Sequence, residues 1–97
     1  MDEAQIEAGV QRAAQALAPD VVSIRYSLGE DWTGDPSVFF RIVLSDEASR
    51  VEHLGERAEC IESKIRNDVR PEELGLNYYF NFRSESEQAE LQEAAWA

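Results

Sequence analysis

Three side chains of the types that bind transition metals stand close together in the sequence: His53, Glu56 and Cys60. Imidazole, carboxylate and thiolate are all common metal ligands. Their spacing places them on one side of a helix, but a straight helix spreads them over ~10 Å, too far to meet on one ion. We therefore expect no metal site, with His53 at the surface and Cys60 as a partly buried structural residue.

Cys60 is also the one thiol of the chain, and hence its one candidate for a cysteine nucleophile. Such a nucleophile needs a lowered thiol pKa and a nearby base. His53 lies nearly two helical turns away, and acidic neighbours raise the pKa of a thiol rather than lower it. No catalytic triad and no glycine-rich phosphate-binding loop occurs in the sequence. We expect no catalytic residue and no cofactor.

A second group of chemically capable residues lies in the segment 29–37, Gly-Glu-Asp-Trp-Thr-Gly-Asp-Pro-Ser. The carboxylates of Asp31 and Asp35 could act as general acid and base, or hold a hard cation. Asp, Gly and Pro are also the residues that build tight turns, and this interpretation is favoured. Trp32, between the two acids, either folds back onto the domain or anchors an interface.

Arginine and aromatic residues form a third group. Arg25, Arg41 and Arg83 could bind an anion or a carboxylate-bearing partner, because guanidinium groups recognise such groups in a bidentate manner. Pairing of these arginines with local acids is the favoured alternative. Phe39 and Tyr79, predicted to share their sheet face, could stack on RNA bases.

Hydrophobic periodicity predicts the elements that position these residues. The first half is expected to be a helix over 2–18, a strand over 21–28, a loop over 29–37 and a strand over 38–44. A long helix then opens at Ser45, and Pro71 ends or kinks it, with an extra turn over 71–75. A strand over 76–82 follows, and a short helix starts with a capping box at Ser84 and ends near Trp96. Asp2 is the expected N-cap of the first helix.

This order predicts a single α+β domain over residues 1–97, a two-layer α-β-β-α-β arrangement of the split β-α-β, ferredoxin-like type. A right-handed crossover makes the third strand parallel to the second. We place the third strand beside the first and antiparallel to it, which gives a three-stranded antiparallel sheet in the order 2-1-3. The predicted strand residues of the core are Val22, Ile24, Tyr26, Phe40, Ile42, Leu44, Tyr78, Phe80 and Phe82.

The opposite sheet face is predicted to be open in a two-layer domain. Its expected residues are Ser23, Arg25, Phe39, Arg41, Val43, Asn77, Tyr79, Asn81 and Arg83. Three coverings are conceivable because sizeable apolar patches are usually buried. The C-terminal helix could fold over it with Leu91 and Trp96, a second copy could pack sheet to sheet, or a protein partner or RNA could bind there.

Charge narrows the class of partner. The chain has 97 residues with 20 acids and 9 bases, a net charge of −11 spread along its length. Nucleic-acid binding through a broad basic face is therefore unfavourable. Such acidity suits rapid association with a basic protein, or simple solubility. No apolar run approaches the length of a membrane span, and the acidic N-terminus is unlike a signal peptide, so we expect a cytoplasmic protein.

Two stretches carry a resemblance: GEDWTGDP, which runs into Phe39-Phe40-Arg41, and YFNFRSESEQ at 79–88. Together they resemble a group of small uncharacterised bacterial proteins encoded beside helical HEPN-like proteins, as in toxin–antitoxin pairs. The resemblance implies a protein partner but carries no catalytic motif. The topology is also similar to that of the cytoplasmic domain of cation-efflux transporters, although the metal-binding histidines of many such domains are missing here.

These observations predict a non-enzymatic, acidic protein-interaction module, an antitoxin-like inhibitor or adaptor that binds a basic partner. The predicted binding residues are Asp31, Trp32, Asp35, Phe39, Arg41, Tyr79 and Arg83. Two alternatives stay open: RNA or nucleotide binding through the open sheet face, and a small enzyme or metal binder that uses the loop around Asp31 and Asp35. A homodimer through the sheet face is a further expectation.

Overall fold

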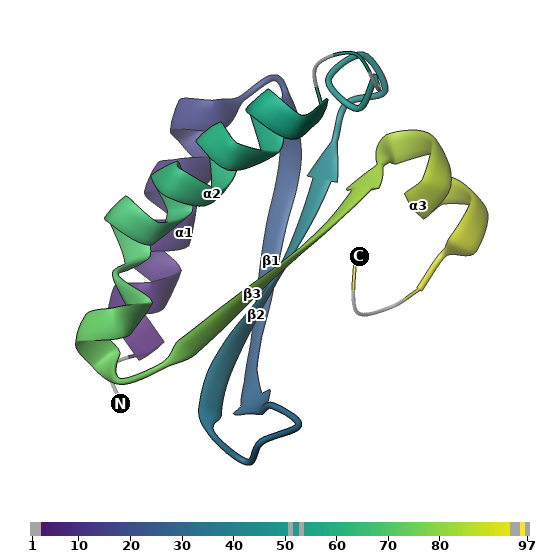
Figure 1. Ribbon diagram of the computed structural model, residues 1–97. Helices are drawn as coiled ribbons and strands as arrows, with labels where there is room; N and C mark the ends of the chain where they lie inside the picture. The colour runs from purple at the N-terminus through teal and green to yellow at the C-terminus, as the bar shows by residue number, and fades with distance from the viewer. Residues whose placement is uncertain (1–2, 51, 53, 94–95, 97) are drawn as a thin grey trace.

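A computed structural model describes residues 3–50, 52, 54–93 and 96 of the chain. The elements in chain order are α1 (Glu3–Leu17), β1 (Val21–Glu30), β2 (Pro36–Leu44), α2 (Leu54–Val69), the 3-10 turn η1 (Pro71–Leu74), β3 (Asn77–Ser84) and α3 (Glu85–Leu91). Helices α1 and α2 lie together on one side of a three-stranded sheet, and α3 lies on the other (Figure 1). The predicted α+β, ferredoxin-like arrangement is confirmed.

The strand order of the sheet is β1-β2-β3, so the predicted order 2-1-3 is wrong. The pair β1–β2 is antiparallel and the pair β2–β3 is parallel, which makes the sheet mixed rather than antiparallel. The crossover through α2 brings the chain back to the immediate neighbour of β2. The burial of β2 agrees with a central place, because Phe40 and Ile42 are buried on the helix side and Val43 on the other.

An extra residue interrupts the pairing of β1 with β2. Val21 pairs with Leu44 and Ser23 with Val43, so Val22 has no partner of its own in the ladder. Such a bulge turns the strand locally. Val21 takes the buried position, whereas Val22 is 50% exposed, and the prediction that Val22 belongs to the core is wrong.

The hydrophobic core lies between the sheet and the two long helices. Its buried members are Ile6, Val10, Ala13, Val21, Ile24, Val38, Phe40, Ile42, Leu44, Ala48, Ile61, Ile65, Val69 and Leu76. Tyr26, Tyr78, Phe80 and Phe82 pack against this cluster and stay partly exposed. They lie on β1 and β3, the edge strands, where a side chain has a neighbouring strand on one side only.

Helix α2 begins at Leu54, so the prediction that it opens at Ser45 is wrong. Residues 46–49 form turns instead, and the Ser45 hydroxyl accepts a hydrogen bond from the Ala48 N–H at 3.1 Å. Ser45 therefore caps a turn rather than the long helix. Ala48 is fully buried in the core, and this burial holds the turns against the domain. Asp2, Val51 and His53 lie outside the described residues.

Other predicted boundaries are closer to the structure. The strands of the hairpin extend to Glu30 and from Pro36, so the connecting loop is residues 31–35 rather than 29–37. The turn after Pro71 is confirmed as η1. The capping box at Ser84 is confirmed, since Ser84 and Glu87 each accept a hydrogen bond from the other's backbone N–H. Helix α3 ends at Leu91, earlier than predicted.

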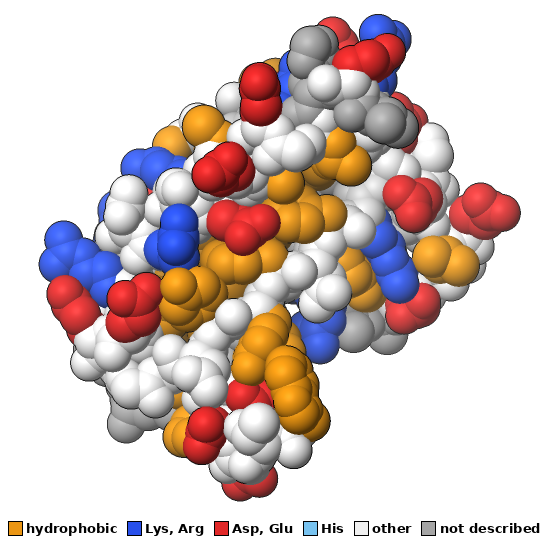
Figure 2. Space-filling view, viewed as in Figure 1, with side chains coloured by type: hydrophobic (Ala, Val, Ile, Leu, Met, Phe, Trp, Pro, Cys, Tyr) orange, Lys and Arg blue, Asp and Glu red, His pale blue; other side chains and the backbone are white. Residues whose placement is uncertain are grey.

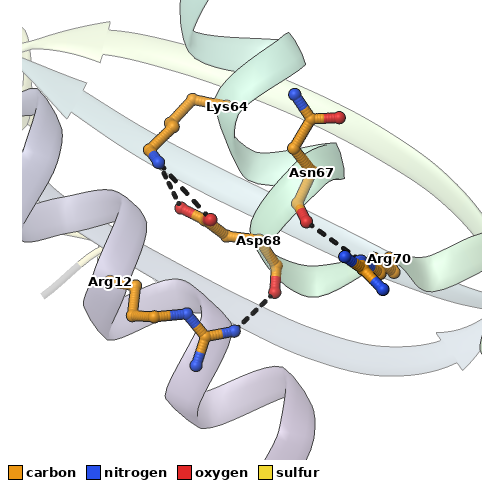
Figure 3. A network of polar contacts seen from close by, with 5 residues as sticks. All are labelled: Arg12, Lys64, Asn67, Asp68 and Arg70. Carbon is orange, nitrogen blue, oxygen red and sulfur yellow. Dashed lines mark hydrogen bonds and ion pairs between the residues drawn. The ribbon is translucent and has the colours of Figure 1, made fainter.

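Close packing and a polar network join the two long helices near the C-terminal end of α2 (Figure 3). Arg12 of α1 donates to the backbone carbonyl of Asp68 at 2.8 Å. The Asp68 carboxylate forms an ion pair with Lys64 at 3.1 Å. Gly9 of α1 lies so near this turn that a Cβ atom placed on it would come within 2.5 Å of the Asp68 carbonyl oxygen. The helices can approach this closely only because position 9 has no side chain.

Candidate functional site

The carboxylate of Asp31 organises the hairpin loop. It accepts five hydrogen bonds: from the backbone N–H and hydroxyl of Thr33, the backbone N–H of Asp35, the side-chain amide of Asn77 and the hydroxyl of Tyr79. The bond from Tyr79 is the shortest to β3, at 2.7 Å. These donors favour the charged form and hold the pKa of Asp31 well below its usual range. The loop is thereby fixed to β3.

This geometry agrees with the turn chemistry that the sequence favours. The Asp31 N–H donates to the Asp35 carbonyl, and the Gly34 N–H donates to the Asp31 carbonyl, both at 3.0 Å. Gly34 has a φ of +85°, a left-handed conformation that suits glycine. The Asp31 residue is 9% exposed and its oxygens are already occupied by donors, which leaves little capacity for a cation or a substrate proton.

Replacing Asp31 by asparagine is expected to lower the melting temperature at pH 7 more than Asp35→Asn does. An amide cannot accept all five bonds, because its NH2 group meets donors on one side. The folded-state pKa of Asp31 is lowered, so its stabilisation is complete above the unfolded value of about 4 and is lost as the pH falls below it. The difference in melting temperature between wild type and Asp31→Asn should therefore shrink from pH 7 to pH 3. A difference that stays constant over this range contradicts the assignment.

Three aromatic rings, Trp32, Tyr79 and Phe39, form a row on the open sheet face, here called the aromatic row. Tyr79 lies between the other two, with ring centroids 5.2 Å from Trp32 and 5.4 Å from Phe39. Phe39 and Tyr79 are directly paired in the β2–β3 ladder. Trp32 contacts Tyr79 yet remains 82% exposed. Figure 2 shows hydrophobic side chains gathered near the hairpin end of the molecule, with acidic groups around them.

The three arginines of this face differ in their surroundings. Arg25 and Arg41 are opposite one another in the β1–β2 ladder, and Arg41 donates to the Ser27 hydroxyl at 3.0 Å. Neither forms an ion pair with any residue that the structure describes. Arg83, by contrast, pairs with Glu93 at 2.8 Å and lies over the Trp96 ring at 4.3 Å. The predicted pairing with local acids is confirmed for Arg83, which is engaged within the chain.

The C-terminal segment covers one end of the open face. Trp96 is buried and lines a shallow hollow with Val22, Ser23, Val43 and residues of α3. Leu91, which was expected to help, remains exposed. Arg25 and Asn81 stay exposed, as does Trp32 at the hairpin end. Of the three coverings considered for the open sheet face, the C-terminal segment therefore covers only the end around Val43.

The remaining candidates do not assemble into a site. Cys60 is an exposed free thiol on α2, so the prediction that it is partly buried is wrong. Among the described residues, no group of three or more His, Cys, Asp and Glu side chains could hold a metal ion. Within the same part of the chain, no helix is both long and apolar enough to cross a membrane.

Comparison with known proteins places this chain in a class defined by its fold. No protein-family profile matches the chain, and no curated protein matches it. Solved structures with this two-layer, ferredoxin-like α+β fold do match. One is the copper form of the MamM CTD, with 16% identity and a TM-score of 0.58 over 87% of this chain and 86% of that chain. A histidine-to-alanine variant of the MamM CTD matches with 16% identity and a TM-score of 0.52, over 88% of this chain and 99% of that chain. At this identity the likeness establishes the fold alone.

Proposed function

We propose that the chain is a non-catalytic protein-interaction module that binds a basic protein through the hairpin end of its open sheet face, as an antitoxin-like inhibitor or adaptor. One observation carries this proposal: Trp32 is 82% exposed although its loop is held in place. Removing a large aromatic side chain from water is favourable when a partner covers it. Tryptophan is also enriched among the residues that dominate binding energy at interfaces.

Preorganisation of the loop supports this assignment. The hydrogen bonds to Asp31 fix the backbone of residues 31–35, and the contact with Tyr79 restricts the Trp32 ring. A side chain that is already ordered loses less conformational entropy on binding than a mobile one. Asp31 and Tyr79 are thus positioning residues, whereas Trp32 offers the contact surface.

Charge supports a basic partner. Glu30 and Asp35 are exposed beside Trp32, and the whole chain carries a net charge of −11. Such a field accelerates the approach of a cationic protein and keeps acidic proteins away. The copper of the MamM CTD structure is not carried over to this chain, since the described residues bring no suitable group of ligands together.

RNA or nucleotide binding is the second candidate, and Arg25 and Arg41 beside Phe39 favour it, because neither forms an ion pair with a described residue. A base would stack on an aromatic ring while a guanidinium met the phosphate. The rings of Trp32 and Phe39 already contact Tyr79. The carboxylates of Asp31 and Asp35 lie near Tyr79, and their negative charge repels phosphate. The protein partner is therefore preferred, and the experiment below separates the two.

The test is a quantitative pull-down from the native organism with immobilised wild type, Trp32→Ala and Leu91→Ala, each with and without nuclease. Leu91 is the matched control, because it is also a large exposed apolar residue but lies on α3. We expect a basic protein to be retained by wild type and Leu91→Ala. Trp32→Ala should weaken its binding by about 2 kcal/mol, about thirty-fold in Kd.

Two outcomes contradict the proposal. Equal retention by wild type and Trp32→Ala, with circular dichroism confirming that both are folded, removes the hairpin end from the interface. Capture of RNA that nuclease abolishes, and that an Arg25→Gln, Arg41→Gln double variant loses, transfers the function to the arginines of the sheet face.

A further inference from the structure

The two edges of the sheet are unlike. Strand β1 carries the bulge at Val22 and the charged residues Arg25 and Glu30. Bulges and charges are common devices that prevent an edge strand from pairing with another chain. Strand β3 has a regular register with β2 throughout and none of these devices in its first six residues, Asn-Tyr-Tyr-Phe-Asn-Phe. These six residues carry no charge, although 30% of the chain is charged.

The surface of β3 is accessible as well as uncharged. Asn77 and Asn81 are exposed, and Tyr78, Phe80 and Phe82 are partly exposed along the helix side of the strand. Figure 2 shows a band of hydrophobic side chains that follows the course of β3 in Figure 1. No other strand in the described part of the chain lies on the outer side of β3, so its outward backbone groups are available to a further strand.

We propose that β3 pairs antiparallel with β3 of a second copy about a two-fold axis at Phe80, which joins two sheets into one of six strands. In this register Phe80 lies opposite Phe80 of the second copy, and Tyr78 lies opposite Phe82. On the other face Tyr79 lies opposite Asn81. Aromatic side chains thus meet aromatic side chains on the helix side, and polar groups meet on the open side. The Phe80 pair lies on the axis and occurs once, whereas the Tyr78–Phe82 and Tyr79–Asn81 pairs each occur twice, as a two-fold interface requires.

The sequence of β3 favours this register over its neighbour. An axis at Asn81 instead would place Asn77 opposite Glu85 and Tyr78 opposite Ser84, which ends the aromatic ladder early. The axis at Phe80 also keeps every charged residue except Arg83 out of the pairing segment, and Arg83 already has its ion pair within the chain. Like-charge repulsion at the contact is therefore small although each copy has a net charge of −11.

Charge also favours this edge over the sheet face as the self-association surface. A sheet-to-sheet dimer would bring the Arg25 and Arg41 pairs of two copies together across one interface. It would also have to seat the protruding Trp32. A charged peptide bound along the outer edge of β3 would have no oppositely charged side chain to pair with on residues 77–82. A second copy of β3 is the partner whose side-chain pattern matches.

The test is sedimentation equilibrium of wild type, Asn81→Lys and Asn67→Lys. Both variants make the same substitution at an exposed asparagine, the first on β3 and the second on α2. We expect wild type to reach twice the monomer mass of 11.0 kDa. Asn81→Lys should raise the dimer dissociation constant at least ~10-fold, because a lysine on an edge strand opposes pairing. Asn67→Lys should leave it unchanged.

Three results would overturn the inference: a wild type that stays at 11.0 kDa up to its solubility limit, equal dissociation constants for the two lysine variants, or a dimer that Trp32→Ala dissociates and Asn81→Lys does not. The last result would assign self-association to the sheet face. Because the pull-down of the proposed function depends on Trp32 rather than on β3, failure of either proposal leaves the other standing.

Discussion

Phe40→Ala is expected to lower the free energy of unfolding by about 3–5 kcal/mol, the usual cost of removing a buried phenyl ring. Phe40 is fully buried at the centre of β2, and its ring stacks on that of Phe80 with centroids 5.3 Å apart. The cavity lies between the middle strand and the helices, where few neighbours can move in to fill it. A loss of this size is a large part of the stability of a domain this small.

Phe39→Ala is the matched control, because it removes the same ring from the adjacent residue on the opposite face. Phe39 is half-buried and stacks on Tyr79, so its loss is expected to cost only about 1 kcal/mol. Urea unfolding followed by circular dichroism measures both. Phe40→Leu, at about 1–1.5 kcal/mol, keeps the comparison measurable if Phe40→Ala does not fold. Equal losses for positions 39 and 40 would contradict the assignment of the two sheet faces.

Gly9→Ala is expected to destabilise the fold by about 2 kcal/mol, since overpacking of a close contact usually costs 1–3 kcal/mol. The new Cβ would lie 2.5 Å from the Asp68 carbonyl oxygen and 2.9 Å from the Val69 Cα. Both are backbone atoms that cannot rotate away. The helices must therefore separate, which also strains the hydrogen bond from Arg12 to the Asp68 carbonyl.

Gly55→Ala, on α2, is expected to change the stability in the opposite direction. Among the described residues, apart from the backbone of its own helix, no atom lies within 4 Å of a Cβ placed at position 55, and the residue is helical. The substitution is expected to stabilise the fold by up to about 1 kcal/mol through helix propensity. Thermal unfolding of the two variants distinguishes the effects. A Gly9→Ala variant as stable as Gly55→Ala would mean that the helices do not approach as closely as the structure places them.

Local features of the fold could be predicted from the sequence. The apolar stripe of α2, the turn at Pro71 and the capping box at Ser84 depend on residues a few positions apart, and all three are present. The start of α2 was predicted too early, because Ser45 carries a genuine capping interaction, but with a turn that Ala48 anchors in the core. A cap alone does not tell how many residues follow it in a helix.

Long-range features could not be predicted in the same way. The alternation in β1 assigned Val22 to the core, and one inserted residue reverses that assignment without a local signal. The prediction of the strand order was wrong for a related reason, although the sequence of β2 contained a signal for the correct order. Apolar residues on both faces of β2 indicate a central strand, whereas the expected order put β2 at an edge.

The prediction of the candidate site depended on the prediction of the strand order. Trp32, Phe39 and Tyr79 were each named from the sequence, but their contact depends on β3 lying beside β2. The hydrogen bond between Asp31 and Tyr79 joins residues 48 positions apart. The expected order placed β1 between β2 and β3, which separates Phe39 from Tyr79, so it does not predict the aromatic row. Arg83 was likewise expected to face a partner, and its engagement with Glu93 and Trp96 depends on the path of the C-terminal segment.

The extra residue at Val22 has a consequence for how large an assembly of this chain can become. Sheets that add strands at both edges grow into filaments, whereas sheets with a single competent edge form closed assemblies. Pairing through β3 leaves both bulged β1 strands on the outside, where the next copy finds an irregular edge. In the proposed dimer, the bulge at Val22 therefore leaves an irregular outer edge on each side, and the assembly is expected to stop at two copies.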